Sequence, residues 1–355
     1  MKASLTAGSK LYKYRLIRPI GRGHFGEVWV ADDLAISQQL AIKILDGTMA
    51  PVAEVLREAK VGHRLNHANL VKVHNADVIA VASTKLVFIA MDYLPSGPIT
   101  SLANAADFVT APKAIAATID VLRGLEYLHN ANLFHNDIKP SNILLGSRGE
   151  ALLSDYGISC TSPGLAPATA SSAYVLHRAP ETAATNRISV ATDIYQVGLT
   201  LFRLLNGIGL VADQRSRLGA MEFEAQKTKG HVPAVTDYQP FIGRALRQII
   251  AKSTAPAAAD RYQSALEMRR ALERLQPIGY WDANASGNFF GMVHNHKITY
   301  QTTSPKVGIE IETRKENLST GRNVRVTRFC LKGLTAGQVE IARRAMMQAV
   351  VDGTI

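Results

Sequence analysis

The spacing of apolar residues changes near residue 112, and this change constrains the fold more than any other feature of the sequence. From Leu11 to about Met91, apolar residues occur in short alternating stretches with one helical pattern at 52–65, which predicts a small β-sheet that carries one helix. From about Pro112 onward they recur at helical spacing. The later helical patterns cover residues 190–206, 240–252 and 261–275. We therefore expect a strand-rich lobe followed by a helix-rich lobe.

A third unit begins where Pro277-Ile278-Gly279 interrupts the last helical pattern. Within it, alternation of apolar and charged residues at 307–312 and 324–326 predicts at least two half-buried strands. Thr335 and Gln338 have the spacing of a capping box that would begin a final helix. Residues 277–355 are expected to form a small α+β module that either docks on the preceding lobes or recruits a partner.

The composition is that of a globular protein, because 47% of the 355 residues are hydrophobic and 19% are charged. Cys160 and Cys330 form no pattern that would indicate a disulfide framework or a thiolate metal site. The chain opens without an apolar run, and polar residues at 83–85 interrupt the most apolar later stretch, so we expect a cytoplasmic protein without a membrane span. The net charge of +11 is spread along the chain and does not indicate a nucleic-acid partner.

A glycine-rich turn covers residues 21–26, with glycines at Gly21, Gly23 and Gly26. Their bare backbone could lie close to phosphate oxygens, but the pattern is weak on its own, and an ordinary hairpin is the alternative interpretation. In a dinucleotide-binding loop the chain runs directly into a helix. Here it continues as an alternating strand at 27–31, so we expect a hairpin that covers a nucleotide.

A second candidate for phosphate binding is Lys43, the single lysine of the apolar strand 41–45. Glu58 lies on the helix predicted after this strand. An ion pair between Lys43 and Glu58 would fix the ammonium group where the α- and β-phosphates of a nucleotide bind. The alternatives are a lysine at an exposed edge and a solvated glutamate on a helix surface.

The most specific segment is His135-Asn136-Asp137-Ile138-Lys139-Pro140-Ser141-Asn142. It is followed by Asp155-Tyr156-Gly157 and later by Ala179-Pro180-Glu181. Together with the glycine-rich turn and Lys43, these segments have the order and spacing of the protein kinase family, which the chain resembles over about residues 11–276. The run from Asp137 to Asn142 is similar to that of the serine/threonine branch, in its soluble bacterial type. The resemblance implies an α+β fold of two lobes, with a β-rich N-lobe and a helical C-lobe.

The resemblance implies a role for each polar residue of these segments. Asp137 would accept the proton of the substrate hydroxyl and orient it. Asn142 and Asp155 would supply oxygen ligands for Mg²⁺, which bridges the phosphates of ATP. The lysines would neutralise phosphate charge. The implied catalytic set consists of Asp137, Lys139, Lys43 and Glu58.

The resemblance also implies how adenine is held. Met91 falls at the gatekeeper position, and residues 92–94 form the hinge whose backbone would pair with the base. Val28 and Ala41 would enclose the ring. The implied nucleotide-binding set is Gly21, Gly23, Phe25, Gly26, Val28, Ala41, Lys43, Met91, Asp92 and Leu94.

Three residues depart from the family pattern. Asn136 replaces an arginine that in many kinases binds a phosphate on the activation segment, the stretch between Asp155-Tyr156-Gly157 and Ala179-Pro180-Glu181. A neutral amide cannot form that ion pair. Tyr156 replaces a phenylalanine and adds a hydroxyl that needs a partner. Tyr174 stands about where a threonine usually touches the catalytic loop, which affects the geometry expected at the substrate site.

These features predict a serine/threonine protein kinase that transfers the γ-phosphate of ATP to protein hydroxyls with Mg²⁺. The alternative is a pseudokinase that binds nucleotide and acts as a scaffold, and it is supported only by the substituted Asn136 and Tyr174. A small-molecule kinase would share the aspartate and the asparagine. Asp193 and Arg261 argue against it, because they match buried structural positions of protein kinases, with Arg261 expected to pair with Glu181.

Because Asn136 removes the usual phosphate partner, we predict that activity does not require a phosphate on the activation segment. Hydroxyls there can still be phosphorylated: Ser159, Thr161, Ser162, Thr169, Ser171 and Ser172. At equal ATP, enzyme stripped by phosphatase should be as fast as autophosphorylated enzyme. A large loss of rate on stripping, restored by rephosphorylation and blocked by alanine at these positions, would show that another cation such as Arg178 binds the phosphate.

Overall fold

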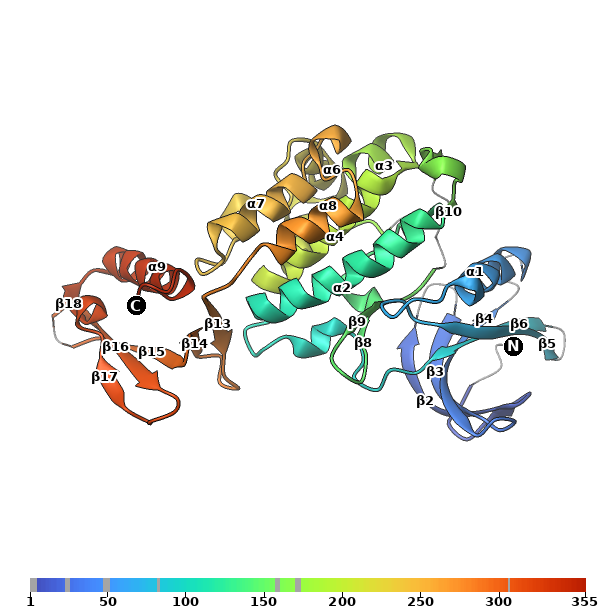
Figure 1. The fold of residues 1–355 in the computed structure, drawn as a ribbon, viewed down its shortest axis with the longest axis horizontal. Helices are drawn as coiled ribbons and strands as arrows, with labels where there is room; N and C mark the ends of the chain where they lie inside the picture. Colours follow the sequence, from blue (N-terminus) through green and yellow to red (C-terminus); the bar gives the residue numbers. More distant parts are fainter. Residues whose placement is uncertain are drawn as a thin grey trace.

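The chain folds into two lobes and an appended module, arranged in a row (Figure 1). The computed structural model describes residues 5–22, 26–46, 52–81, 84–156, 160–169, 174–305 and 307–355. An antiparallel sheet forms the N-lobe, helices form the C-lobe in the middle, and the module lies at the far end from the N-lobe. The expected α+β fold of two lobes is confirmed.

The N-lobe sheet has the strand order β1-β2-β3-β4-β6-β5. Its strands are β1 (Lys10–Leu11), β2 (Tyr14–Arg22), β3 (Gly26–Asp33), β4 (Gln38–Asp46), β5 (Val73–Val81) and β6 (Thr84–Asp92). Helix α1 (Val52–Arg64) packs on β5 and β6, close to the predicted 52–65. Strands β2 and β3 pair antiparallel, so the hairpin itself is confirmed, and that it covers a nucleotide stays a prediction.

Strand β4 sends alternate side chains to opposite faces of this sheet. Ile42 and Ile44 are buried in one apolar cluster together with Tyr14 and Phe88. Lys43, between them, therefore points to the other face of the sheet. The alternation explains how an otherwise apolar strand presents one lysine away from that cluster.

The C-lobe is built around α4, in which every residue from 191 to 206 is buried. Its helices are α2 (Ala111–Asn130), α3 (Pro180–Thr185), α4 (Val190–Asn206), α5 (Leu210–Leu218), α6 (Ala220–Thr228), α7 (Arg244–Ser253) and α8 (Ala265–Glu273). Short strand pairs join them: β7 (Leu133–Phe134) with β10 (Cys160–Thr161), β8 (Ile143–Leu145) with β9 (Ala151–Leu153), and β11 (Ala168–Thr169) with β12 (Arg187–Ile188). Short 3₁₀ helices cover Ile99–Leu102, Pro140–Asn142, Pro163–Leu165, Val235–Asp237, Ala258–Asp260 and Thr327–Phe329.

Two helices begin later than the sequence predicts. Helix α7 starts after Gly243 instead of at 240, and α8 starts after Ser264 instead of at 261. The Ser264 hydroxyl accepts a hydrogen bond from the Glu267 amide and so caps α8. Helices α5 and α6 are not among the predicted patterns, because each has nine residues and only two buried side chains.

The expected structural pair of the C-lobe is present. Arg261 is 1% exposed, and its guanidinium donates to both carboxylate oxygens of Glu181 at 2.8 Å. It also donates to the carbonyls of Ala255, Ala191 and Pro256. A buried cation needs such partners, and this one ties the end of the activation segment to the loop before α8.

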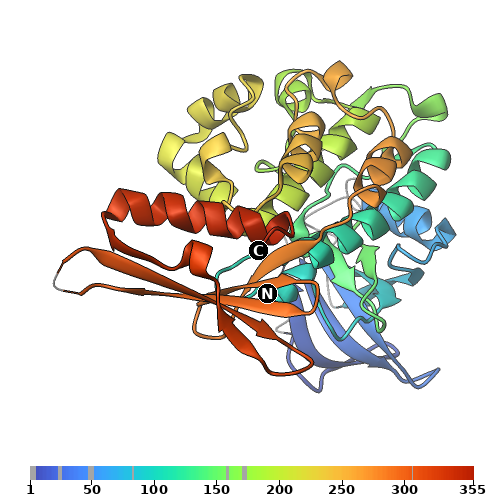
Figure 2. The ribbon, with the colours of Figure 1, turned by 60° about the vertical axis from the view of Figure 1, so that its left-hand side comes forward.

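In its described residues, the module has six strands, one α-helix and the 3₁₀ helix Thr327–Phe329. The strands are β13 (Gly279–Ala283), β14 (Phe289–Val293), β15 (His296–Thr303), β16 (Ile309–Asn317), β17 (Asn323–Arg325) and β18 (Leu331–Leu334), and the helix is α9 (Ala336–Val351). Helix α9 lies along one face of the sheet (Figure 2), where the Trp281 indole donates to the Met347 carbonyl at 3.0 Å. The predicted capping box of Thr335 and Gln338 is confirmed.

The sequence prediction of at least two strands covers β16 and β17 but omits β13–β15 and the four-residue β18. Strands β13–β15 precede the clearly alternating stretch, and β14 shows why such a strand can be missed. In β14, Gly291 and Val293 are buried, whereas Phe290 and Met292 on the other face are only half-buried. A short strand with apolar residues on both faces has no clear period of two.

The module docks on the C-lobe through an aromatic cluster. The Phe289 ring stacks on Phe108 at 5.8 Å and lies 5.9 Å from Phe241, and the latter two rings are 5.0 Å apart. The Asn104 amide donates to the Asp282 carboxylate at 2.9 Å beside it. One apolar core includes buried residues of the lobes and of the module. Docking is therefore observed, whereas a partner of the module and the 276/277 boundary stay predictions.

Within the described ranges, no single helix is long and apolar enough to cross a membrane. Helices α4 and α5 meet that criterion only when taken together, as a pair bent by 104°.

We predict that Phe289→Ala loosens the module. Removing a half-buried ring from the cluster should cost about 2 kcal/mol of unfolding free energy, less than the loss for a fully buried phenylalanine. Phe290→Ala is the matched control, because that ring contacts Lys297 on the other face of β14. Thermal unfolding measures both. Equal melting temperatures for the two variants would contradict docking through Phe289.

Candidate active site

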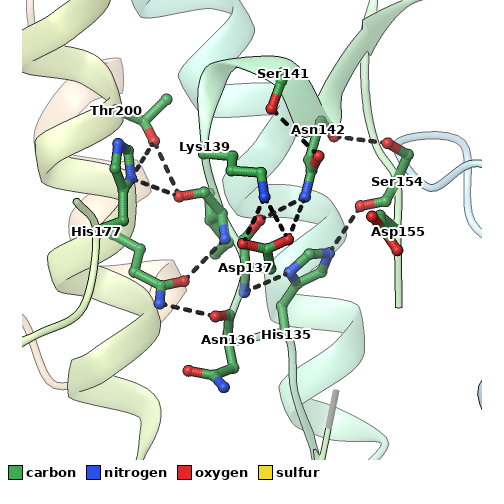
Figure 3. A network of polar contacts seen from close by, with 12 residues as sticks. His135, Asn136, Asp137, Lys139, Ser141, Asn142, Ser154, Asp155, His177 and Thr200 are labelled. Carbon is green, nitrogen blue, oxygen red and sulfur yellow. Dashed lines mark hydrogen bonds and ion pairs between the residues drawn. The ribbon is translucent and has the colours of Figure 1, made fainter. Parts of the chain in front are cut away.

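Two loops meet at the end of the C-lobe that faces the N-lobe. The catalytic loop, residues 135–142, connects β7 to β8, and Asp155 follows β9 shortly after. Because β8 and β9 pair with Ile143 opposite Leu153, the residues next to the hairpin come together. The Ser154 amide donates to the Asn142 carbonyl at 2.9 Å, and so does its hydroxyl at 3.0 Å. The hairpin therefore brings Asn142 and Asp155 to the same site (Figure 3).

Side chains from α4 fix the backbone of the catalytic loop. The Asp193 carboxylate accepts hydrogen bonds from the amides of His135 at 3.0 Å and Asn136 at 2.7 Å. The Gln196 amide accepts from the Ile138 N–H and donates to the Asn136 carbonyl, both at 2.9 Å. Asn136 has a φ of 63°, a left-handed conformation that asparagine tolerates better than most residues. The change from arginine to asparagine thus suits the backbone here.

Asp137, the expected base, lies at the centre of the loop. Its two carboxylate oxygens accept hydrogen bonds from Lys139 Nζ at 3.0 and 2.8 Å, and Asn142 Nδ2 donates to one of them at 2.8 Å. Burial raises the pKa of Asp137 above its ordinary value, although the Lys139 charge opposes this. A raised pKa makes a carboxylate a stronger proton acceptor, which suits a general base.

His135 is a neutral ring that hydrogen-bonds the backbone of Asp137. Its Nε2 lies 3.1 Å from the Ser154 carbonyl, which can only accept, and its Nδ1 accepts from the Asp137 amide at 3.2 Å. Nε2 therefore carries the proton. Burial lowers the pKa of His135, which is consistent with the neutral form. The ring joins the catalytic loop to the strand before Asp155.

Lys43 reaches across from the N-lobe to Asp155. Its Nζ lies 3.0 Å from a carboxylate oxygen of Asp155. Burial works to raise the pKa of Asp155, but the charge and hydrogen bond of Lys43 outweigh it and hold that pKa below its ordinary value. Asp155 is therefore ionised, as a metal ligand must be. The side chain of Glu58, the predicted partner of Lys43, lies outside the described residues.

The extra hydroxyl of Tyr156 finds backbone carbonyls as hydrogen-bond partners. The hydroxyl donates toward the carbonyls of Val71 at 3.1 Å and Leu153 at 3.2 Å. Burial raises the pKa of Tyr156 well above its ordinary value, so the hydroxyl stays protonated. Gly62 on α1 lies so near that a Cβ there would be 3.2 Å from the Tyr156 ring. The side chain thus links α1, the loop before β5 and the end of β9.

Four of the predicted nucleotide-binding residues share one face of the N-lobe sheet. Val28 pairs with Lys43, and Ala41 pairs with Met91, so these four side chains point the same way. Asp92 ends β6 and Leu94 follows it. Gly23 and Phe25 lie outside the described residues. Gly21 lies in β2, and Gly26 begins β3 so close to β4 that a Cβ would be 2.0 Å from the Ile44 carbonyl oxygen.

The donor set fits Mg²⁺ bound together with phosphates. Asn142 Nδ2 is held by the carbonyl and carboxylate of Asp137, so a metal would be bound by its Oδ1, which the Ser141 hydroxyl contacts at 3.4 Å. An amide oxygen and one carboxylate are hard ligands, and Mg²⁺ usually takes its remaining ligands from phosphates and water. In the part of the chain that the structure describes, no group of three or more His, Cys, Asp or Glu side chains could hold a metal by itself. Asn142 and Asp155 would therefore hold the ion jointly with ATP.

Several residues at the site are absent from the sequence prediction. Gln196 and Thr200 of α4 both bind the catalytic loop, and so does His177 of the activation segment. A signal for the first two exists, because they lie three and seven residues after Asp193 and so share its face of the helix. Arg178, the substitute phosphate partner considered above, contacts Glu224 at 3.1 Å.

Comparisons with known proteins agree with this geometry. The family model described as "Protein kinase domain" matches residues 14–265. Serine/threonine-protein kinase PknJ of Mycobacterium tuberculosis is 31% identical over 76% of this chain and 46% of its own length. Serine/threonine-protein kinase PrkC of Bacillus subtilis is 26% identical over 72% of this chain and 39% of its own length. A probable serine/threonine-protein kinase of Streptomyces coelicolor is 29% identical over 75% and 41%. The chain spans less than half the length of these relatives.

The contact between Lys139 and Asp137 generates a pH prediction. Lys139 lowers the pKa of Asp137, so Lys139→Met should raise that pKa further. Asp137 would then be ionised only at higher pH, and the acidic limb of the rate profile should move to higher pH, in addition to a loss of rate. Lys139→Arg keeps the charge and is the control. A limb that stays in place in Lys139→Met would contradict Asp137 as the base.

Proposed function

The chain belongs to the protein kinase family, and on this premise we propose that it transfers the γ-phosphate of ATP to serine or threonine hydroxyls of protein substrates. The observation that carries the proposal is the arrangement of Asp137, Lys139 and Asn142 in one hydrogen-bonded group. Such a group can take a proton from a hydroxyl and hold positive charge beside it, and phosphoryl transfer depends on the protein mainly for positioning and for electrostatic stabilisation.

The proposed mechanism assigns one task to each group. A substrate hydroxyl would replace one of the present hydrogen bonds of Asp137 and pass its proton to that carboxylate. The ammonium group of Lys139 would also stabilise negative charge on the phosphate being transferred. The ammonium group of Lys43 would bind the α- and β-phosphates from the N-lobe side. Mg²⁺, held by Asn142 and Asp155, would neutralise charge on the phosphates of ATP.

The serine/threonine preference has two supports. Residues 137–142 have a sequence similar to the motif of that branch. The relatives reported above carry the name serine/threonine-protein kinase. A pseudokinase has no specific observation in its favour. Asn136 fits its left-handed backbone, and Tyr174 contacts Lys139, so both substitutions are accommodated at an intact site.

A cytoplasmic location and a partner of the module are further proposals. The location is supported by the two free cysteines, which fit a reducing compartment. A partner is supported only by the module being an ordered unit with its own sheet and helix. Protein substrates follow from the proposed reaction.

Asp137→Asn should lower phosphotransfer by about 10²–10⁴-fold, because an amide cannot accept the proton. Asn keeps the shape of the side chain, so ATP binding and the melting temperature should remain near wild type. Transfer of labelled phosphate to a generic protein substrate, followed by analysis of the labelled amino acid, measures both the rate and the serine/threonine preference. Asp213→Asn, on the exposed start of α5, is the control.

Two results would count against the proposal. Near wild-type transfer by Asp137→Asn would remove the assigned base. A wild-type chain that binds ATP with Mg²⁺ and transfers nothing would favour the scaffold interpretation.

A further inference from the structure

His177 is a buried imidazole that the mechanism above does not use. It lies in the activation segment, is 0% exposed, and stands beside the catalytic loop (Figure 3). Its Nδ1 lies 2.8 Å from the Ile138 carbonyl oxygen and 3.5 Å from the Thr200 hydroxyl, which itself donates to that carbonyl. Its Nε2 lies 2.8 Å from Arg203 Nη1, which comes from the last turns of α4. Both ring nitrogens are therefore engaged.

These two partners fix the proton on the ring. A carbonyl oxygen can only accept a hydrogen bond, so Nδ1 must carry the hydrogen. A guanidinium can only donate, so Nε2 must be the bare nitrogen that accepts. A protonated ring would set an N–H against the Arg203 N–H. Burial and the Arg203 charge both hold the pKa of His177 well below its ordinary value, which agrees with one neutral tautomer.

The carbonyl that His177 binds is at a sensitive place in the loop. Ile138 stands between the base, Asp137, and Lys139, so the orientation of its peptide groups directs both side chains. The Thr200 hydroxyl donates to the same carbonyl at 3.3 Å, and Gln196 holds the Ile138 N–H. Both backbone polar groups of Ile138 are thus bound from α4, and one of them also from the activation segment.

Tyr174 makes a second connection from the same segment. Lys139 Nζ lies 4.5 Å from the centre of the Tyr174 ring, a distance at which a cation is attracted to the ring face. The Tyr174 ring is 5.6 Å from the His177 ring. The residue at the usual threonine position therefore still touches the catalytic loop, through its ring.

We propose that His177 is a positioning residue for phosphotransfer. Its Nδ1–H holds the Ile138 carbonyl, and Arg203 fixes the tautomer. The placement of Asp137 and Lys139 therefore depends on residues 174–178 packing against the catalytic loop. The proposal rests on the proposed kinase activity. It adds that the activation segment reaches the base through a neutral histidine. A role limited to filling the core is the competing explanation.

Kinetics of three variants separate positioning from packing. His177→Phe keeps a ring and removes both hydrogen bonds, whereas His177→Asn places an amide nitrogen near the position of Nδ1. Asn206→Ala is the matched control, since Asn206 is buried on α4 and binds the Phe202 carbonyl and the Gln239 amide, away from the loop. Each variant is measured for kcat, for KM of ATP and for melting temperature.

His177→Phe should lower kcat by about 10- to 100-fold with KM for ATP near wild type, because the loop is displaced and nucleotide binding is kept. His177→Asn should recover most of this loss. Asn206→Ala should lower the melting temperature and leave kcat unchanged. A kcat that falls only in proportion to lost folded protein, or equally in His177→Phe and His177→Asn, would overturn positioning while leaving the kinase activity standing. A wild type without any transfer would overturn both proposals.

The tautomer has a direct spectroscopic readout. In protein labelled with ¹⁵N-histidine, His177 is assigned by the signals lost in His177→Asn. Its Nδ1 should appear protonated and its Nε2 bare, without titration between about pH 6 and pH 8, the range where an ordinary histidine changes charge. Arg203→Met should weaken this preference. A protonated Nε2, or a ring that titrates in this range, would overturn the inferred hydrogen bonds whatever the kinetics show.

Discussion

The backbone conformation of the catalytic loop depends on its hydrogen bonds to the buried carboxylate of Asp193. Asp193 is 1% exposed, and its carboxylate accepts hydrogen bonds from two successive backbone amides of the loop and from His129 Nε2 at 2.9 Å. A carboxylate inside an apolar helix is unfavourable unless donors surround it. Here two of the donors are backbone amides of the catalytic loop, which need acceptors because they are buried. The carboxylate and the amides therefore satisfy each other's hydrogen bonds. The loop takes its shape from α4 more than from its own sequence.

The same face of α4 continues this support along the loop. Asp193, Gln196, Thr200 and Arg203 are spaced three, four and three residues apart, which places them in one stripe of the helix. The first three bind loop backbone directly, and Arg203 acts through His177. In a helix that is otherwise mostly apolar, and buried from Ala191 to Asn206, this stripe is a rigid template. Rigidity matters because small displacements of catalytic groups cost large factors in rate.

Local signals made much of this architecture predictable. Helix α4 has the predicted bounds of 190–206 because its apolar pattern is long and Gly207, with a φ of 142°, ends it. The candidate catalytic residues can be named because their spacing within 135–142 and at Asp155 is specific, and their roles stay predictions. Strand β14 was not predicted, because a short strand with apolar residues on both faces shows no clear period. The contacts of Gln196 and His177 were not either, because they bind backbone atoms 39 to 60 residues away, and no side-chain pattern records a backbone partner.

We propose that the fold of the C-lobe already places the residues that would hold ATP and Mg²⁺. A crystal structure of the chain with a non-hydrolysable ATP analogue and Mg²⁺ would test this. An Mg²⁺ ion is expected about 2.0–2.1 Å from Asn142 Oδ1 and from an Asp155 carboxylate oxygen. Residues 135–142 are expected to keep their hydrogen bonds to α4. A metal held by other residues, or a catalytic loop that leaves Asp193 and Gln196 when nucleotide binds, would contradict it.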